Sequence, residues 1–225
     1  MPKIRAALFD LDGTLQDSEV LWVKATRDYV RDLGVPFSDE DAFAVVYGRS
    51  WRSIYDDILA RKPSLASSSM EKMAVEVREY FLRLRSTADI AIPGSVNLAR
   101  KLAADGVKVA VVSGSIREDV QSGVEALGID GILEFIIGAE DYGEGKPDPG
   151  CYLKGSEKIG VPPAECIVFE DSAVGVLAAR RAGMYAVGLA RPDRPKQDLT
   201  PADLILPDLS EFSIDKLPAH PGERC

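Results

Sequence analysis

The chain has 225 residues, of which 46% are hydrophobic and 28% are charged, and its formal net charge at pH 7 is −9. This composition is typical of a globular domain, and the acidic balance argues against a nucleic-acid or anionic-membrane partner, which would favour a basic surface. No apolar run approaches the roughly 20 residues of a membrane helix. Asp10 also interrupts the apolar start that a secretory signal needs. We therefore expect a cytoplasmic protein that binds neither nucleic acid nor membrane.

Cysteine and histidine are both scarce. The three cysteines, Cys151, Cys166 and Cys225, are scattered and odd in number, which favours a reducing compartment without a disulfide framework. Cys166 opens an apolar run, so we expect it in the core. The single histidine, His220, lies in a proline-rich tail where we expect an exposed, frayed residue. This distribution argues against a catalytic histidine and against zinc sites built from cysteine and histidine.

The first expected element is a short strand that ends near Phe9, because the Asp and Gly residues that follow are poor strand formers. The next 70 or so residues show helical periodicity without a strand signal. The expected helices are 18–33, a segment through Val46 opened by a capping box at Ser38 and Asp41, a short helix ended by Pro63, and 69–85. We expect Asp17 or Ser18 to cap the first of them.

Helices and strands alternate in the rest of the chain. The expected order is helix 95–104, strand 107–113, helix 117–127, a strand near 135–137, helix 149–159, strand 166–169, helix 173–182, strand 185–189 and a possible edge strand 204–206. The strands are continuously apolar and are joined by helices, which predicts an α/β fold whose parallel sheet is covered on both faces.

Polar residues follow four of these strands. They are Asp10 and Asp12, then Ser113-Gly114-Ser115, then Gly145-Lys146-Pro147-Asp148, and finally Glu170-Asp171-Ser172. Each could be an ordinary turn, surface residue or helix cap, but ligands of open α/β sheets bind beyond the carboxyl ends of the strands. Carboxylates suit Mg²⁺, whereas serine, backbone N–H groups and lysine suit phosphate. An EF-hand starting at Asp10 is excluded, since its glycine is in the fourth position and its twelfth residue is Leu21.

The stretches FDLDGTLQDS, VVSGS, GKPDP and FEDSAVGVLAARRAGM, in this order, resemble the four motifs of the haloacid dehalogenase superfamily. More narrowly, they resemble its sugar-phosphate phosphatases and phosphomutases, and the resemblance runs from Ile4 to about Leu209. It implies a doubly wound, Rossmann-like core with an inserted all-helical cap. We therefore expect a catalytic core of residues 1–16 and 92–225 and a cap domain of residues 17–91.

The resemblance also implies a role for each carboxylate. Asp10 would be the nucleophile that forms an aspartyl-phosphate, and Asp12 would be the general acid and then the general base. Mg²⁺ would bind the Asp10 side chain, the Asp12 main-chain carbonyl and Asp171. Glu170 would be a further ligand or an outer partner of the metal site.

The phosphate contacts are implied in the same way. Ser113, with the backbone of Gly114, would hold phosphate oxygens, and Lys146 would stabilise the negative charge. In the expected cap, Arg49 and Arg52 flank Trp51 in GRSWRS. Arg49 could bind the substrate, or the pair could simply form a solvated helix start.

The predicted function is a magnesium-dependent phosphatase that acts on a small phosphorylated metabolite, such as a sugar phosphate. The alternative is a mutase of the β-phosphoglucomutase type, which shares the four motifs. The mutases carry a histidine in the first cap helix. The matching place here is near Trp22, and the single histidine of the chain is His220, so the sequence favours the phosphatase. Asp12 disfavours the halide-removing and phosphonate-cleaving branches of the superfamily. The intact motif residues disfavour a third reading, a regulatory scaffold without turnover. We expect a monomer or weak dimer.

Overall fold

The computed structural model describes residues 3–46, 49, 51–66 and 68–217. The chain forms two units, one of Met1–Gln16 with Ala91–Cys225 and one of Asp17–Ile90. We call them the core unit and the helical cap. No helix within the described ranges is long and apolar enough to cross a membrane.

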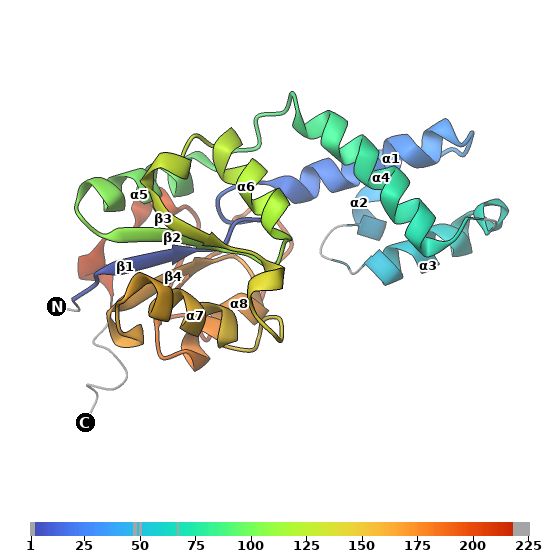
Figure 1. Ribbon diagram of the computed structural model, residues 1–225. Helices are drawn as coiled ribbons and strands as arrows, with labels where there is room; N and C mark the ends of the chain where they lie inside the picture. The colour runs from blue at the N-terminus through green and yellow to red at the C-terminus, as the bar shows by residue number, and fades with distance from the viewer. Residues whose placement is uncertain (1–2, 47–48, 50, 67, 218–225) are drawn as a thin grey trace. The chain divides into compact units, whose positions relative to one another are not determined.

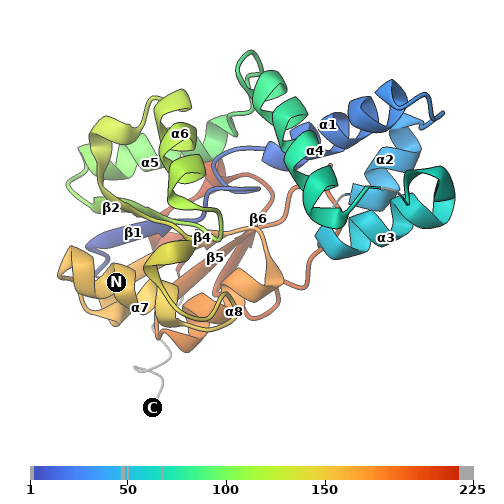
Figure 2. The ribbon, with the colours of Figure 1, turned by 45° about the vertical axis from the view of Figure 1, so that its right-hand side comes forward.

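A six-stranded sheet lies at the centre of the core unit, in the order β3-β2-β1-β4-β5-β6 (Figures 1 and 2). Every neighbouring pair is parallel. The strands are β1 (Ala6–Phe9), β2 (Lys108–Val112), β3 (Leu133–Ile137), β4 (Cys166–Glu170), β5 (Tyr185–Leu189) and β6 (Leu204–Leu206). The chain proceeds outward from β1 to β3 on one side and from β4 to β6 on the other. This doubly wound topology confirms the predicted fold class.

Helices cover both faces of the sheet (Figure 1). On one face lie α5 (Pro93–Ala104) and α6 (Arg117–Ala126), and on the other lie α7 (Gly150–Ile159) and α8 (Ala173–Arg181). Alternate residues of β1 belong to the apolar layers on the two faces of the sheet. Phe9 packs in the layer of α5 and α6, and Leu8 packs in the layer of α7 and α8. Because both faces are buried, the strands are apolar at consecutive positions, as their sequence predicted.

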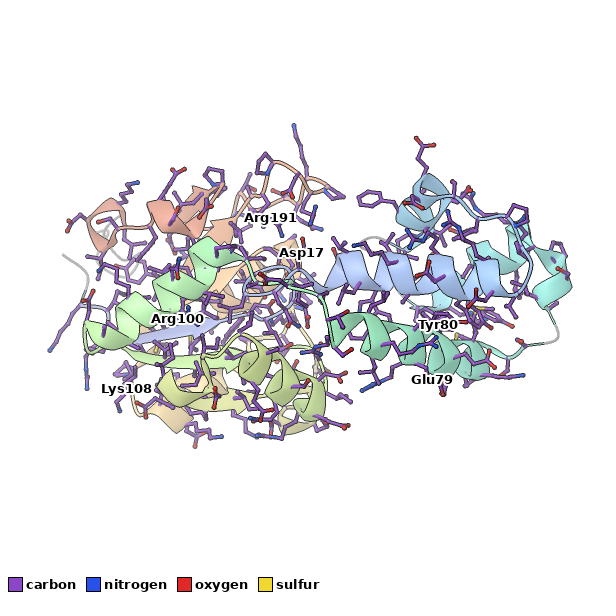
Figure 3. The ribbon with its side chains drawn as sticks, turned by 90° about the horizontal axis from the view of Figure 1, so that it is seen from above. Asp17, Glu79, Tyr80, Arg100, Lys108 and Arg191 are labelled. Carbon is purple, nitrogen blue, oxygen red and sulfur yellow. The ribbon has the colours of Figure 1, made fainter. Side chains whose placement is uncertain are left out.

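The helical cap has an apolar cluster of its own, which includes Ile58, Met73 and Val77. Its helices are α1 (Ser18–Asp32), α2 (Asp39–Val46), α3 (Trp51–Arg61) and α4 (Met70–Arg85). Helices α1 and α4 run side by side (Figure 3), and the Tyr80 hydroxyl on α4 donates to Asp32 Oδ2 at 2.6 Å. The cap therefore buries its own core and does not depend on the sheet for it.

Short 3₁₀ turns complete the fold at Pro63–Leu65, Asp130–Ile132, Ala139–Asp141, Pro163–Glu165, Leu209–Glu211 and Ile214–Lys216. The expected elements are all present, with bounds that differ by one or two residues at most ends. Cys166 is fully buried, as predicted, and Cys151 is too. His220 and Cys225 lie outside the described residues.

Two capping predictions had different outcomes. The capping box is confirmed, since the Asp41 N–H donates to Ser38 Oγ and the Ser38 N–H donates to Asp41 Oδ2, both at 3.0 Å. Of the two residues expected to cap α1, Asp17 occupies the N-cap position but its side chain makes no capping hydrogen bond, so that expectation is wrong, and Ser18 is the first residue of the helix. The Asp17 backbone (φ −98°, ψ 65°) is not extended as an N-cap usually is. The Asp17 N–H instead donates to the Ile90 carbonyl at 2.7 Å.

Leu8→Ala tests how much the sheet core contributes to stability. Leu8 of β1 is fully buried against α7, where a Cβ on Gly155 would lie 3.1 Å from its Cδ1. We expect the substitution to lower the free energy of unfolding of the core unit by about 2–5 kcal/mol through a lost contact and a cavity. The control is Leu153→Ala, at a position 42% exposed, with a much smaller effect expected. Urea unfolding followed by far-UV circular dichroism measures both, and equal losses would contradict the assigned core.

Candidate active site

The strand register brings the polar strand ends together. Phe9 of β1 pairs with Phe169 of β4, so that Asp10 and Glu170 follow at the same level. The Asp10 N–H donates to the Phe169 carbonyl at 3.0 Å and continues this pairing. Strands β1 and β4 are the neighbours at which the strand order reverses, where doubly wound sheets open a crevice for ligands.

The Lys146 ammonium bridges these two strand ends. Its Nζ donates to Asp10 Oδ1 at 2.6 Å, to Glu170 Oε1 at 2.7 Å and to the Val112 carbonyl at 3.3 Å. Only 9% of the side chain is exposed. Burial by itself would lower the pKa of Lys146, but Asp10 and Glu170 outweigh it and raise the pKa well above its usual value. Lys146 therefore remains charged and holds the two carboxylates in place.

Both carboxylate oxygens of Glu170 accept hydrogen bonds. Its Oε1 also accepts from the Tyr152 hydroxyl at 3.0 Å, and its Oε2 accepts from the N–H and hydroxyl of Ser172 at 3.0 and 2.8 Å. A Cβ on Gly175 of α8 would lie 1.8 Å from Oε1, so only glycine allows this approach. Burial would raise the pKa of Glu170, but Lys146 and Ser172 lower it. Glu170 is therefore a charged anchor for Lys146.

Asp10, Glu170 and Asp171 form a cluster whose carboxylate oxygens lie within 4.8 Å of one another. Three carboxylates against one ammonium leave a formal charge of −2. Burial raises the pKa of Asp10 well above its usual value; Lys146 lowers it, and the other two carboxylates raise it further. A divalent cation would relieve this repulsion, and carboxylate oxygens are the ligands that Mg²⁺ prefers.

The backbone also makes room for Asp171. A Cβ on Gly13 would lie 2.1 Å from Asp171 Oδ2, and Gly13 has a φ of +87°, which favours glycine. The Thr14 hydroxyl donates to Asp171 Oδ1 at 3.2 Å and fixes the carboxylate beside the turn. The residues present at this cluster therefore fit a magnesium ion, both in the chemistry of their oxygens and in the space that Gly13 leaves.

Two side chains donate hydrogen bonds to the Asp12 carboxylate. Its Oδ2 accepts from the Ser115 hydroxyl at 2.7 Å, and its Oδ1 accepts from Gln16 Nε2 at 2.8 Å. Gln16 is almost fully buried and forms backbone bridges with Asp12 and with Ala91. Both donors therefore fix the orientation of the Asp12 carboxylate.

Ser113 and Gly114 follow β2 in a loop at the same sheet edge. The Ser113 hydroxyl oxygen accepts from the Ser115 N–H at 3.0 Å, which leaves its own O–H for another acceptor. The Ser113 carbonyl accepts from the Tyr142 hydroxyl at 3.1 Å. Gly114 is exposed beside it. The loop can therefore donate both a hydroxyl and backbone N–H groups to an anion.

The chain is similar to known proteins along most of its length. The model of the family described as haloacid dehalogenase-like hydrolase matches residues 7–189, which include all four motifs. The chain belongs to this family. The predicted enzyme class, a haloacid dehalogenase-like phosphoric monoester hydrolase, agrees with the family and with a phosphatase among its relatives.

This haloacid dehalogenase-like hydrolase is 35% identical, over 207 residues, to validoxylamine A 7'-phosphate phosphatase of Streptomyces hygroscopicus subsp. limoneus, with 92% of this chain and 95% of the relative covered. It is 26% identical to beta-phosphoglucomutase of Bacillus subtilis (strain 168), covering 95% and 94%. The crystal structure of CbbY from Rhodobacter sphaeroides in complex with phosphate shares the fold, with a TM-score of 0.75, 24% identity, and 95% and 99% covered.

The structure places the expected site residues of this hydrolase in two groups. The first group is the carboxylate cluster of Asp10, Glu170 and Asp171 together with Lys146, which pairs with Asp10 and Glu170. The second group is Asp12 and Ser113, which are linked by hydrogen bonds from Ser115. Arg49 lies in the helical cap, where it pairs with Asp57 at 2.5 Å and also contacts Ser53. The second cap arginine, Arg52, pairs with Asp56 at 3.3 Å.

Four residues that touch this site were not singled out from the sequence. They are Thr14, Gln16, Tyr142 and Tyr152. Gln16 gave a weak signal, as an amide in an otherwise apolar or acidic stretch. Tyr152 gave none, because a tyrosine on a helix face is usually part of the core and its reach to Glu170 depends on how α7 packs on the sheet.

Lys146→Met tests the charge balance of the site. It leaves Glu170 and Asp10 buried without a counter-charge, which should lower the free energy of unfolding by about 3–5 kcal/mol near neutral pH. In the wild type, the pKa of Glu170 is lower in the folded protein than in the unfolded chain. Glu170 therefore stabilises the fold at pH values above its unfolded pKa, and this stabilisation is lost as the pH falls through its folded pKa. The raised pKa of Asp10 acts in the opposite direction. In the variant both pKa values are raised, so the deficit relative to wild type should shrink as pH falls.

The measurement is urea unfolding in excess chelator, at about pH 7.5 and about pH 5. The control is Lys101→Met, because Lys101 pairs with Asp105 while 70% of its side chain is exposed, and such a pair contributes about 1 kcal/mol or less. A deficit for Lys146→Met that stays constant or grows toward low pH would contradict the assigned charge states.

Proposed function

We propose that this protein is a magnesium-dependent phosphatase that hydrolyses a small phosphorylated metabolite, such as a sugar phosphate, through an aspartyl-phosphate on Asp10. The observation that carries the proposal is the buried Asp10 carboxylate, held at 2.6 Å by Lys146 within the Asp10–Glu170–Asp171 cluster. The core unit acts as the catalytic core and the helical cap as the cap domain, within one residue of the bounds expected from the sequence, 1–16 with 92–225 and 17–91. The small-molecule substrate, the cytoplasmic location and the monomeric or weakly dimeric state belong to the same proposal.

The Asp10 and Asp171 side chains and the Asp12 main-chain carbonyl would hold Mg²⁺. The ion supplies positive charge that polarises the phosphoryl oxygens and neutralises charge that develops on them. The Glu170 carboxylate accepts hydrogen bonds from Lys146, Tyr152 and Ser172, so we assign Glu170 as the residue that positions Lys146. The Gly13 turn gives Asp171 the room to take part.

The proposed reaction has two steps. In the first, an Asp10 oxygen attacks phosphorus, a bond forms between them, and the bond from phosphorus to the leaving oxygen breaks. Asp12 gives its proton to that oxygen, so the alcohol departs neutral. In the second, Asp12 takes a proton from water as the water attacks phosphorus, and phosphate is released from Asp10. Lys146, Ser113 and the Gly114 backbone support the charge on the phosphoryl oxygens.

The cap favours water over a second sugar hydroxyl as the acceptor. A mutase has to hold a bisphosphate by its distal phosphate, which calls for cationic groups in the cap. Here Arg49 pairs with Asp57 and Arg52 with Asp56, so each guanidinium already has a carboxylate partner. Trp22 stands near the place where the mutases carry a histidine. Both observations support the phosphatase over the β-phosphoglucomutase alternative.

Asp10→Asn tests the nucleophile. The amide keeps the shape but lacks the attacking charge, so phosphate release from a panel of sugar and aryl phosphates should become undetectable.

We expect wild-type activity to disappear in excess chelator and to return with Mg²⁺. Phosphorus NMR with β-glucose 1-phosphate and a trace of the bisphosphate identifies the product. Glucose 6-phosphate accumulating before inorganic phosphate would make the protein a mutase, and an active Asp10→Asn variant would exclude the covalent mechanism.

Asp12→Asn and Gln16→Leu test the acid–base assignment together. Loss of general acid–base help at Asp12 should cost about 10²–10⁴-fold in turnover. Gln16→Leu removes the donor to Asp12 Oδ1, and one hydrogen bond to a charged group corresponds to a loss of roughly tenfold or more. In both variants the first-turnover burst should suffer less with an aryl phosphate, whose leaving group needs little protonation. Gln16→Asn should recover part of the loss if its amide still reaches Asp12. Equal burst losses for good and poor leaving groups would contradict these roles.

A further inference from the structure

Hydrogen bonds hold both sides of the loop that follows β2 in the core unit. The Ser113 N–H donates to the Ile137 carbonyl at 3.0 Å. The Ser115 carbonyl accepts from the Ala139 N–H at 2.9 Å, and the Ser115 N–H donates to Ser113 Oγ at 3.0 Å. Among the residues that the structure describes, none accepts a hydrogen bond from the Gly114 N–H. This amide is therefore a backbone donor that the loop can offer to a ligand.

The Tyr142 hydroxyl fixes the peptide that joins Ser113 to Gly114. It donates to the Ser113 carbonyl at 3.1 Å. The C=O and N–H groups of a trans peptide lie in one plane and point in opposite directions. A Ser113 carbonyl held toward Tyr142 therefore directs the Gly114 N–H to the opposite side.

Glycine at position 114 makes this contact consequential. Gly114 does not have a positive φ in the structure, and turning its preceding peptide over would bring φ into the positive region. Most residues resist such a φ, whereas glycine adopts it at little cost. The peptide thus has two accessible orientations, and the Tyr142 hydroxyl selects one of them.

Tyr142 is itself held in place by the segment that follows β3. The preceding residue, Asp141, accepts from the Gly138 N–H at 2.8 Å and from the Arg117 guanidinium at 2.6 Å. The Asp141 carbonyl also accepts from Lys154. The Tyr142 ring packs against the apolar layer of α7 and α8. Burial raises the pKa of the Tyr142 hydroxyl, so the group stays protonated and remains a donor.

We propose that Tyr142 is a positioning residue, whose hydroxyl orients the peptide between Ser113 and Gly114 so that the Gly114 N–H donates to a phosphate oxygen. The inference rests on the proposed function, in which the Gly114 backbone supports the phosphoryl oxygens. Because every ester carries the same phosphate group, the contribution of Tyr142 is independent of the leaving group. Asp12 and Gln16 differ in this respect, since their loss should matter most for poor leaving groups.

Tyr142→Phe tests the inference, because it keeps the ring and removes only the hydroxyl. The probe is inorganic phosphate added to the Mg²⁺-loaded protein, with Kd measured by isothermal titration calorimetry. We expect Kd to rise about fivefold to tenfold, as for the loss of one hydrogen bond, and kcat/KM to fall by a similar factor with sugar and aryl phosphates alike. The control is Tyr80→Phe, because the Tyr80 hydroxyl donates to Asp32 within the helical cap. It should keep the wild-type Kd.

Gly114→Ala provides a second readout, which a loss of stability alone would not change. A Cβ at Gly114 would lie 3.9 Å from the Tyr142 hydroxyl oxygen, an ordinary van der Waals contact, so alanine fits. Alanine disfavours a positive φ and with it the reversed peptide. When Gly114→Ala is already present, adding Tyr142→Phe should therefore raise Kd by less than about twofold, well below the effect of one lost hydrogen bond.

The possible outcomes separate this inference from the proposed function. A wild-type Kd in Tyr142→Phe, or an equal rise with and without Gly114→Ala, would overturn the inference and leave the phosphatase intact. Weakened phosphate binding in Tyr142→Phe, in a protein that hydrolyses no ester, would support the inference and overturn the proposed function. One further measurement needs no variant, since saturating phosphate should move the Gly114 amide proton downfield in proton–nitrogen NMR spectra of the wild type. An unmoved resonance would also overturn the inference.

Discussion

The buried ammonium of Lys146 is the interaction on which the site depends. A lysine that is 9% exposed remains charged because Asp10 and Glu170 lie 2.6 and 2.7 Å from it, and these carboxylates tolerate burial because the ammonium is there. The three groups come from the end of β1, the end of β4 and the loop that precedes α7. Their mutual dependence therefore fixes three segments, far apart in the chain, at one edge of the sheet.

Close backbone approach is the second constraint, and it explains two glycines. Gly13 leaves room for the Asp171 carboxylate, and Gly175 leaves room for Glu170 under the first turn of α8. Any side chain at either position would displace an acid of the cluster. Around these acids, Tyr152 and Thr14 donate hydrogen bonds that fix each carboxylate. The oxygens of the cluster are thus held in fixed orientations by the protein itself, which limits the reorganisation that the proposed binding of a cation and a phosphate would require.

The helical cap has an apolar core of its own. Its apolar cluster, with Ile58, Met73 and Val77, is formed entirely within the cap. The hydrogen bonds of the Lys146 ammonium go to Asp10, Val112 and Glu170, all in the core unit. The apolar packing of the cap and the charge balance around Lys146 therefore rest on different residues.

The sequence by itself determined the parallel sheet, the helical insertion and the four polar strand ends, because continuous apolar runs, helical spacing and turn residues are local signals. The same signals placed Asp10, Glu170 and Asp171 at the ends of two strands and Lys146 in the loop before α7, where the structure has them. Only the tertiary structure decided which of their atoms meet and that Gln16 and Tyr152 join them. It also paired Arg49 with Asp57 and left Asp17 without its expected capping bond. These outcomes depend on strand register and helix packing, which no window of the sequence contains.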